Sequence, residues 1–144
     1  MKILLICLCA WALAQIIKVI LGFIREHQFN WSYFVSSGGM PSSHSATVSA
    51  LATSVGLTYG IDNVSFAIAA VLAIVVMYDA AGVRRAVSRQ AFILNRIMRE
   101  MRNQKPREEL GKEVKELVGH SPFQVFIGMA LGIIVAGIGI LITR

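Results

Sequence analysis

The amino-acid sequence predicts an all-α membrane protein: a polytopic bundle of about four membrane-spanning helices with an additional basic amphipathic helix. Hydrophobic residues make up 56% of the 144 residues and charged residues only 15%, against roughly 25% charged in soluble proteins. Several apolar stretches approach or reach the roughly 20 residues that a bilayer crossing requires. Ten of the 14 lysines and arginines lie between residues 81 and 120. A chain of this length predicts one domain, residues 1–144.

The first predicted span covers residues 3–24 and is interrupted by Gln15 and Lys18. Residues 25–43 form a polar segment rich in glycine and serine. The second predicted helix, residues 44–59, is built from alanine, serine, threonine and valine. Small side chains allow helices to pack closely, so we expect this helix at the centre of the bundle.

A tight turn at residues 60–63 separates the second helix from the third, and Asn63 or Ser65 is expected to cap the third. The third span, residues 64–78, ends near Asp79.

Residues 80–119 differ in character because arginines alternate there with apolar residues, with a spacing that predicts an amphipathic helix. Such a basic segment suits the surface of the cytoplasmic leaflet better than a nucleic-acid groove, and no nucleic-acid recognition motif accompanies it. A short charged helix is predicted at residues 108–118.

The last span, residues 123–143, follows Ser121 and Pro122, and proline is favoured at the first position of a helix. Gly128 and Gly132 form a G-x-x-x-G pair. This pattern predicts close helix packing, which is compatible with a homo-oligomer formed through small-residue helix faces.

The positive-inside rule places the basic segment on the cytoplasmic side of the membrane. Four spans then bring the segment of residues 25–43 to the same side. Ionisable groups near the membrane interior are costly and therefore indicate function. The groups expected to converge at this one face are Lys18, Arg25, His44, Asp79, Arg84, Arg85 and His120.

The strongest local motif is the run of small residues at 36–46, which ends as the second helix begins. A helix N-terminus presents free N–H groups and the positive end of the helix dipole, which together favour an anion such as phosphate. His44 beside such a site is suited to donate a proton to a leaving oxygen. The alternative is a structural glycine loop in which Ser42 or Ser43 caps the helix.

The sequence Pro41-Ser42-Ser43-His44 resembles the P-S-G-H motif of the type 2 phosphatidic acid phosphatase superfamily, which is related by motif to vanadium haloperoxidases. The flanking residues 38–40 and 45–46, together with residues 78–85, resemble the short divergent branch of that superfamily, of which this chain looks like a small bacterial membrane member. The resemblance therefore implies a bacterial plasma membrane. The resemblance extends from Lys18 to Gly132.

The resemblance implies a role for each matching residue. Lys18 and Arg25 have the spacing of the phosphate-gripping motif K-x6-R-P, although Glu26 replaces the proline. The general-acid histidine of the second motif corresponds to His44, and Ser43 stands where glycine is usual.

In the third motif, S-R-x5-H-x3-D, the histidine that attacks phosphorus corresponds to His120. Gln124 occupies the position of the orienting aspartate, and Glu113 and Val114 occupy the serine and arginine positions.

Other residues are candidates to replace the missing groups. A phosphoryl transition state requires positive charge around its oxygens, which Arg84 or Arg85 can supply beside the N–H groups of Ser42 and Ser43. An attacking imidazole must be held at one nitrogen, either by Asp79 or by the side-chain oxygen of Gln124.

The sequence thus favours a membrane enzyme that hydrolyses a phosphorylated lipid, a phosphomonoester or a diphosphate, at the cytoplasmic face through a histidine nucleophile. No cofactor or metal is expected, because cationic side chains and helix dipoles supply the charge. One alternative is a weakly active or inactive relative that binds or moves anionic lipids. Another is a structural membrane subunit.

Overall fold

The computed structural model describes residues 1–26, 39–102 and 120–143, and all five helices within them are α-helices. Their bounds are α1 (Lys2–Glu26), α3 (Ser43–Tyr59), α4 (Val64–Ala81), α5 (Val83–Arg102) and α6 (Pro122–Ile142). The prediction of an all-α membrane bundle is confirmed. The short helix predicted at residues 108–118 lies outside the described residues.

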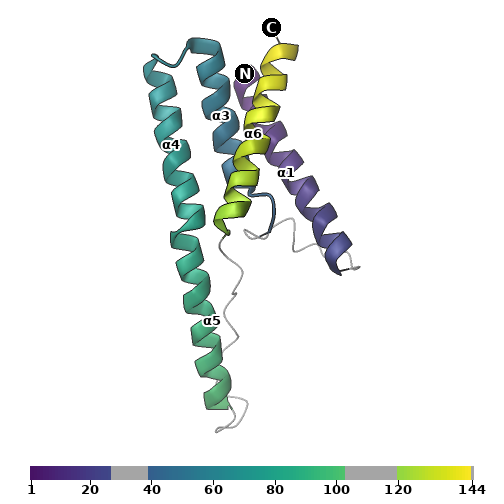
Figure 1. The fold of residues 1–144 in the computed structure, drawn as a ribbon, viewed down its shortest axis with the longest axis vertical. Coiled ribbons are helices and arrows are strands. Elements are labelled where there is room, and N and C mark those ends of the chain that lie inside the picture. The colour runs from purple at the N-terminus through teal and green to yellow at the C-terminus, as the bar shows by residue number, and fades with distance from the viewer. Residues whose placement is uncertain (27–38, 103–119, 144) are drawn as a thin grey trace.

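Helix α3 occupies the centre of the bundle and packs against α1, α4 and α6 (Figure 1). Its buried residues are mostly alanine and serine, and Ala46 and Ala50 are fully buried. Small side chains let three helices approach the same central helix, as the composition of this segment predicts.

Three helical stretches are long and apolar enough to cross a membrane: Lys2–Ile24, Val64–Glu100 and Pro122–Ile142. Their large apolar side chains are mostly exposed in the chain, as expected for surfaces that contact lipid rather than water. Helix α3, with 17 residues, is enclosed by the others and completes the four-helix bundle.

The two glycines of the G-x-x-x-G pair bring α6 into backbone contact with α3. A Cβ atom added at Gly128 would collide with the carbonyl oxygen of Ser42, and one added at Gly132 with that of Ala46. The glycine pair therefore serves packing between two helices of the same chain. The close approach fixes the position of α6 along the axis of α3.

Both chain ends lie at the same end of the bundle as the α3–α4 turn (Figure 1). The Lys2 ammonium donates a hydrogen bond to the carbonyl of Thr143 at 2.5 Å. At that turn Asn63 caps α4 by accepting a hydrogen bond from the Ser65 N–H at 2.8 Å. We call this the terminal end of the bundle, and the opposite end the site end.

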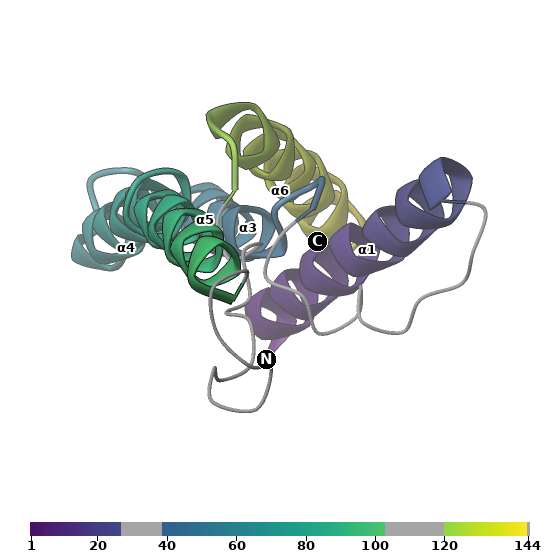
Figure 2. The ribbon, with the colours of Figure 1, turned by 90° about the horizontal axis from the view of Figure 1, so that it is seen from below.

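The chain stays helical beyond the predicted end of the third span. Helix α4 continues to Ala81, and after Gly82 alone the chain resumes as α5, which projects beyond the site end in nearly the same direction (Figures 1 and 2). Gly82 is the C-cap of α4, but α5 begins directly after it, and the change in residue pattern at this point did not reveal that the two helices follow one another in line.

Candidate functional site

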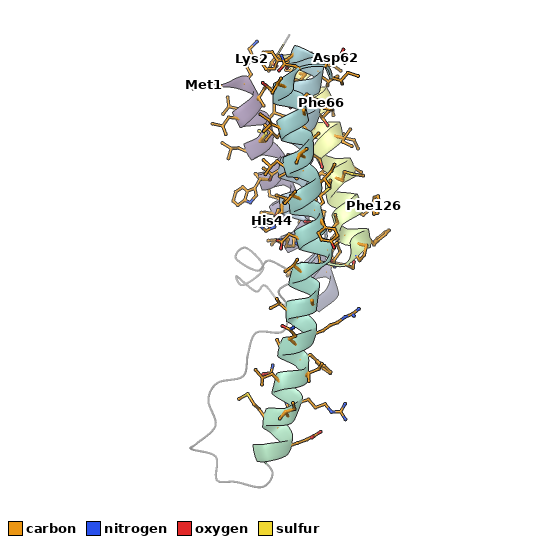
Figure 3. The ribbon with its side chains drawn as sticks, turned by 90° about the vertical axis from the view of Figure 1, so that its left-hand side faces the viewer. Met1, Lys2, His44, Asp62, Phe66 and Phe126 are labelled. Atoms are coloured by element: carbon orange, nitrogen blue, oxygen red, sulfur yellow. The ribbon has the colours of Figure 1, made fainter. Side chains whose placement is uncertain are left out.

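The start of α3 is the first component of the site. Ser42 is the N-cap: its hydroxyl accepts hydrogen bonds from the Ser45 N–H at 3.3 Å and from the Ser45 hydroxyl at 3.0 Å. Helix α3 therefore begins at Ser43, and His44 lies in its first turn, at the site end and far from Met1 and Asp62 (Figure 3). The positive end of the helix dipole lies beside this histidine.

The start of α6 is the second component. Ser121 and Gln124 form a capping box, in which the Ser121 hydroxyl accepts from the Gln124 N–H at 3.3 Å and the Gln124 side-chain oxygen accepts from the Ser121 N–H at 3.0 Å. The Gln124 backbone carbonyl also accepts from the Ser42 N–H at 3.2 Å. The first turns of α3 and α6 are thus tied together directly.

His120 lies immediately before α6 and is 1% exposed. Its N–H donates to the carbonyl of Ala80 near the end of α4, at 3.2 Å, and its Nδ1 lies 3.3 Å from Oε1 of Gln124. Backbone and ring are therefore held by two different helices, α4 and α6.

The capping box also determines which ring nitrogen of His120 carries the proton. Because the Gln124 oxygen accepts from Ser121, the same oxygen faces Nδ1 of His120, and Nδ1 must be the donor in the neutral ring. Nε2 then carries the lone pair. It is buried and has no hydrogen-bond partner of good geometry among residues 1–26, 39–102 and 120–143, although the backbone of Gly39 interacts with the ring.

The pKa of His120 lies below its ordinary value. Burial is the main cause, and the positive charges of Lys18 and His44 lower the pKa further. The hydrogen bond with Gln124 and the backbone of Gly39 act in the opposite direction but are outweighed. The neutral imidazole form of His120 is therefore favoured at neutral pH.

Lys18 reaches the same place from α1, and it is 2% exposed. Its methylene chain passes over Gly39, where an added Cβ would lie 3.2 Å from the Lys18 Cγ. Gly39 has φ of +99°, a conformation that favours glycine. Glycine at this position therefore both permits the turn and leaves room for the lysine.

The rings of His44 and His120 have centroids 6.4 Å apart and are inclined by 62°. At this separation both rings can face one small anionic group that the Lys18 charge also reaches. The structure thus brings together Lys18, Ser42, Ser43, His44 and His120, all predicted from the sequence, at the meeting point of α1, α3 and α6.

The remaining predicted residues are placed less fully. Asp79 is half-buried near the end of α4, one residue before Ala80, whose carbonyl accepts the His120 N–H. Of the two residues expected to hold Nδ1 of His120, Asp79 or Gln124, the contact described is that with Gln124. Arg25 lies near the end of α1 and Arg84 and Arg85 in the first turn of α5, and their side chains lie outside the described part. No cluster of His, Cys, Asp or Glu able to hold a metal ion occurs in the described ranges.

Three contacts at the site were not predicted: Gly39 with Lys18, the Ser42 N–H with the Gln124 carbonyl, and His120 with Ala80. These contacts join segments that are far apart in the chain, and the periodicity of a sequence predicts only contacts within one helix or strand. The capping box did have a signal, the pattern S-x-x-Q at Ser121-Pro122-Phe123-Gln124.

Comparison with known proteins agrees with the resemblance in the motifs. The sequence pattern of a family described as "Divergent PAP2 family" matches residues 1–135, which include every candidate site residue. The chain belongs to the divergent PAP2 family.

This divergent PAP2 protein is similar in sequence to the "Uncharacterized membrane protein YuiD" of Bacillus subtilis (strain 168). It is 41% identical over 136 residues, a match that covers 88% of this chain and 86% of that protein. No solved structure matches the chain. The long apolar helices and the membrane-protein relative identify an integral membrane protein.

Proposed function

We propose that this divergent PAP2 protein is a membrane phosphatase that hydrolyses a phosphorylated lipid, with His120 as the nucleophile. One observation carries the proposal: His120 is buried and neutral, its Nδ1 proton is directed to Gln124, and Nε2 is left with a lone pair beside Lys18 and His44. An uncharged imidazole with one nitrogen held in place is the state required of a nucleophile.

In the proposed first step, Nε2 of His120 forms a bond to phosphorus as the bond from phosphorus to the leaving oxygen breaks. His44 gives a proton to that oxygen, and the dephosphorylated lipid departs. The Lys18 ammonium and the N–H groups at the start of α3 stabilise the charge on the phosphoryl oxygens.

In the second step, water attacks the phosphorus of the phosphohistidine and gives its proton to His44. The bond between phosphorus and Nε2 breaks, and inorganic phosphate leaves with the His120 ring restored. Arg25, Arg84 and Arg85 are proposed as further cationic contacts to phosphate, and Asp79 as a carboxylate that organises them. No cofactor takes part in either step.

A lipid substrate suits the surroundings of the site. The outer faces of the bundle carry large exposed apolar side chains close to the site end, for example Phe123 and Phe126. A phosphate attached to an acyl or isoprenoid chain can therefore reach the site while its chain stays in the bilayer. Both a phosphomonoester and a diphosphate present the required terminal phosphoryl group.

A second candidate function is favoured by the same glutamine. A neutral amide stabilises an imidazolium less than a carboxylate does, so the charge that develops on His120 during attack receives less support. A protein that binds or moves anionic lipids without turning them over is consistent with such a site.

The experiment is phosphate release from a panel of phosphorylated lipids by the purified protein, with and without a chelator. We expect chelator-resistant turnover that is lost in His120→Ala and strongly reduced in His44→Ala. Asp62→Asn, at the terminal end, is the matched control and should retain turnover. Rapid quenching should trap an acid-labile, base-stable phosphoprotein.

Three results would contradict this mechanism. Turnover that survives His120→Ala would exclude this nucleophile. Turnover abolished by the chelator would transfer the chemistry to a metal ion. Specific binding of phosphorylated lipid without any release would favour the non-catalytic function.

A further inference from the structure

Helix α5 carries an exposed apolar face outside the bundle, and the site chemistry does not use it. Val83, Val87, Leu94 and Ile97 are each between 44% and 53% exposed. At 100° per residue these four side chains fall within an arc of about 80° around the helix. The described residues of the chain leave this face uncovered.

The other sides of α5 are different. Ala91 and Asn95 are 4% and 2% exposed, so one side is covered within the protein. Arg89 and Arg96 are exposed and lie together about 120–140° around the helix from the apolar face, and the exposed ring of Phe92 lies on this basic side as well. This three-sided pattern is typical of a helix that lies in a membrane interface, with basic side chains in the headgroups.

The charge of α5 indicates which kind of surface its apolar face contacts. The helix contains six arginines and a single acidic residue, Glu100, which pairs with Arg96 at 3.3 Å. A second copy of the same helix would bring like charges together, whereas anionic lipid headgroups would neutralise them. The charge therefore favours an anionic lipid surface over self-association.

The position of α5 brings it to such a surface. The 18 residues of α4 extend about 27 Å, close to the thickness of the hydrocarbon core, so α5 begins at the level of the headgroups. Only Gly82 separates the two helices. At this junction the Gly82 N–H donates to the Tyr78 carbonyl at 2.8 Å, and the Gly82 carbonyl accepts from the Ala86 N–H at 3.0 Å.

We propose that α5 tilts about Gly82 and docks its face of Val83, Val87, Leu94 and Ile97 onto the anionic lipid surface of the leaflet at the site end. The extended course in Figure 1 is then the undocked arrangement. This inference is independent of catalysis, because it concerns a surface that lies outside the site.

The test uses the full-length protein in vesicles, after Cys7→Ala and Cys9→Ala remove the native thiols. A spin label is attached at Leu94→Cys on the apolar face, or at Arg96→Cys on the basic side as the matched control. Accessibility to oxygen and to a water-soluble nickel reagent reports membrane depth. Vesicles of phosphatidylcholine alone are compared with vesicles that also contain phosphatidylglycerol.

In anionic vesicles we expect the label at position 94 to lie below the phosphate level and the label at 96 to stay in water. Replacing Arg89 by glutamine should lower the docking equilibrium about fivefold, as expected for one basic residue near an anionic surface. Lys2→Gln, at the terminal end, should leave it unchanged.

Two results would overturn the proposal. One is a label at position 94 that remains accessible to water in anionic vesicles. The other is a label at 94 that is shielded from lipid as well as water and couples magnetically to a second labelled copy, which would show that another chain covers this face.

Discussion

The side-chain oxygen of Gln124 performs two tasks, because it caps α6 through the Ser121 N–H and orients the His120 ring through Nδ1. A carboxylate at this position would hold the same proton but would also stabilise the protonated ring. The amide fixes the tautomer without raising the pKa of the histidine as far, and burial then dominates. This single residue therefore links the local fold to the proton state of the proposed nucleophile.

Gln124→Glu is expected to raise the pKa of His120, because the imidazolium gains a negative partner. Since the attacking ring must be unprotonated, the acid limb of the kcat/KM profile should move upward by about 1 to 3 pH units. The measurement is phosphate release as a function of pH. Gln124→Met keeps the length of the side chain and removes the oxygen, so it should lower turnover without the upward shift.

An unchanged acid limb in Gln124→Glu would show that His120 is not the group whose protonation limits activity. It would also separate a purely structural capping role from the positioning role, because capping alone does not move a pH profile.

The depressed pKa of His120 also predicts a pH dependence of stability. Below the ordinary histidine pKa of about 6.5 the unfolded chain takes up a proton that the folded protein resists, so stability falls as pH decreases through that range. Above it the contribution is constant. Thermal unfolding in detergent should therefore shift to lower temperature between about pH 7.5 and pH 5.5.

The comparison variant is His120→Gln, which lacks the titrating ring. It should lose less stability over the same pH interval than the native protein. An equal loss in both would assign the effect to other groups.

At the scale of helices, the site depends on how closely α6 approaches α3. Gly128→Ala would force its Cβ into the carbonyl of Ser42 and within 3.1 Å of the Ser45 Cβ. Overpacking of this kind costs about 1–3 kcal/mol. Because Ser42 begins α3, the displacement should also reduce phosphate release. The measurement is the fraction of protein that remains monodisperse after heating in detergent.

Gly137→Ala is the matched control in the same helix. A Cβ there meets nothing within 4 Å, and alanine is the better helix former, so stability should stay equal or rise slightly. If Gly128→Ala behaved like Gly137→Ala, the tight contact between α3 and α6 would not be required.

The sequence predicted four of the five helices within three residues at each end, because the apolar stretches are long and bounded by serine, asparagine, glycine or proline. Helix α5 was expected as a basic amphipathic segment, but its continuity with α4 was not. Lys18, His44 and His120 were predicted to meet because motif and topology agree. The contacts of Gly39 and Ala80 were not predictable, since they depend on how helices from distant parts of the chain come together.

For the molecule as a whole, the separation of its two ends determines how its orientation can be tested. The termini and the α3–α4 turn lie at the terminal end, whereas the site and the arginine-rich α5 lie at the other (Figures 1 and 3). Under the positive-inside rule, the arginines of α5 outweigh the opposing charge of Lys2, which favours the cytoplasm for the site end.

We therefore expect a cysteine at Asp62 to react with a membrane-impermeant maleimide in intact cells, and a cysteine at Arg96 to react only after permeabilisation. Both positions are exposed in the chain, so a difference in labelling reports the side of the membrane rather than burial. The inverse pattern would place the site outside, where extracytoplasmic lipid phosphates would be the substrates to test. Labelling of both positions in intact cells would be incompatible with a turn and a helix at opposite ends of one membrane-spanning bundle.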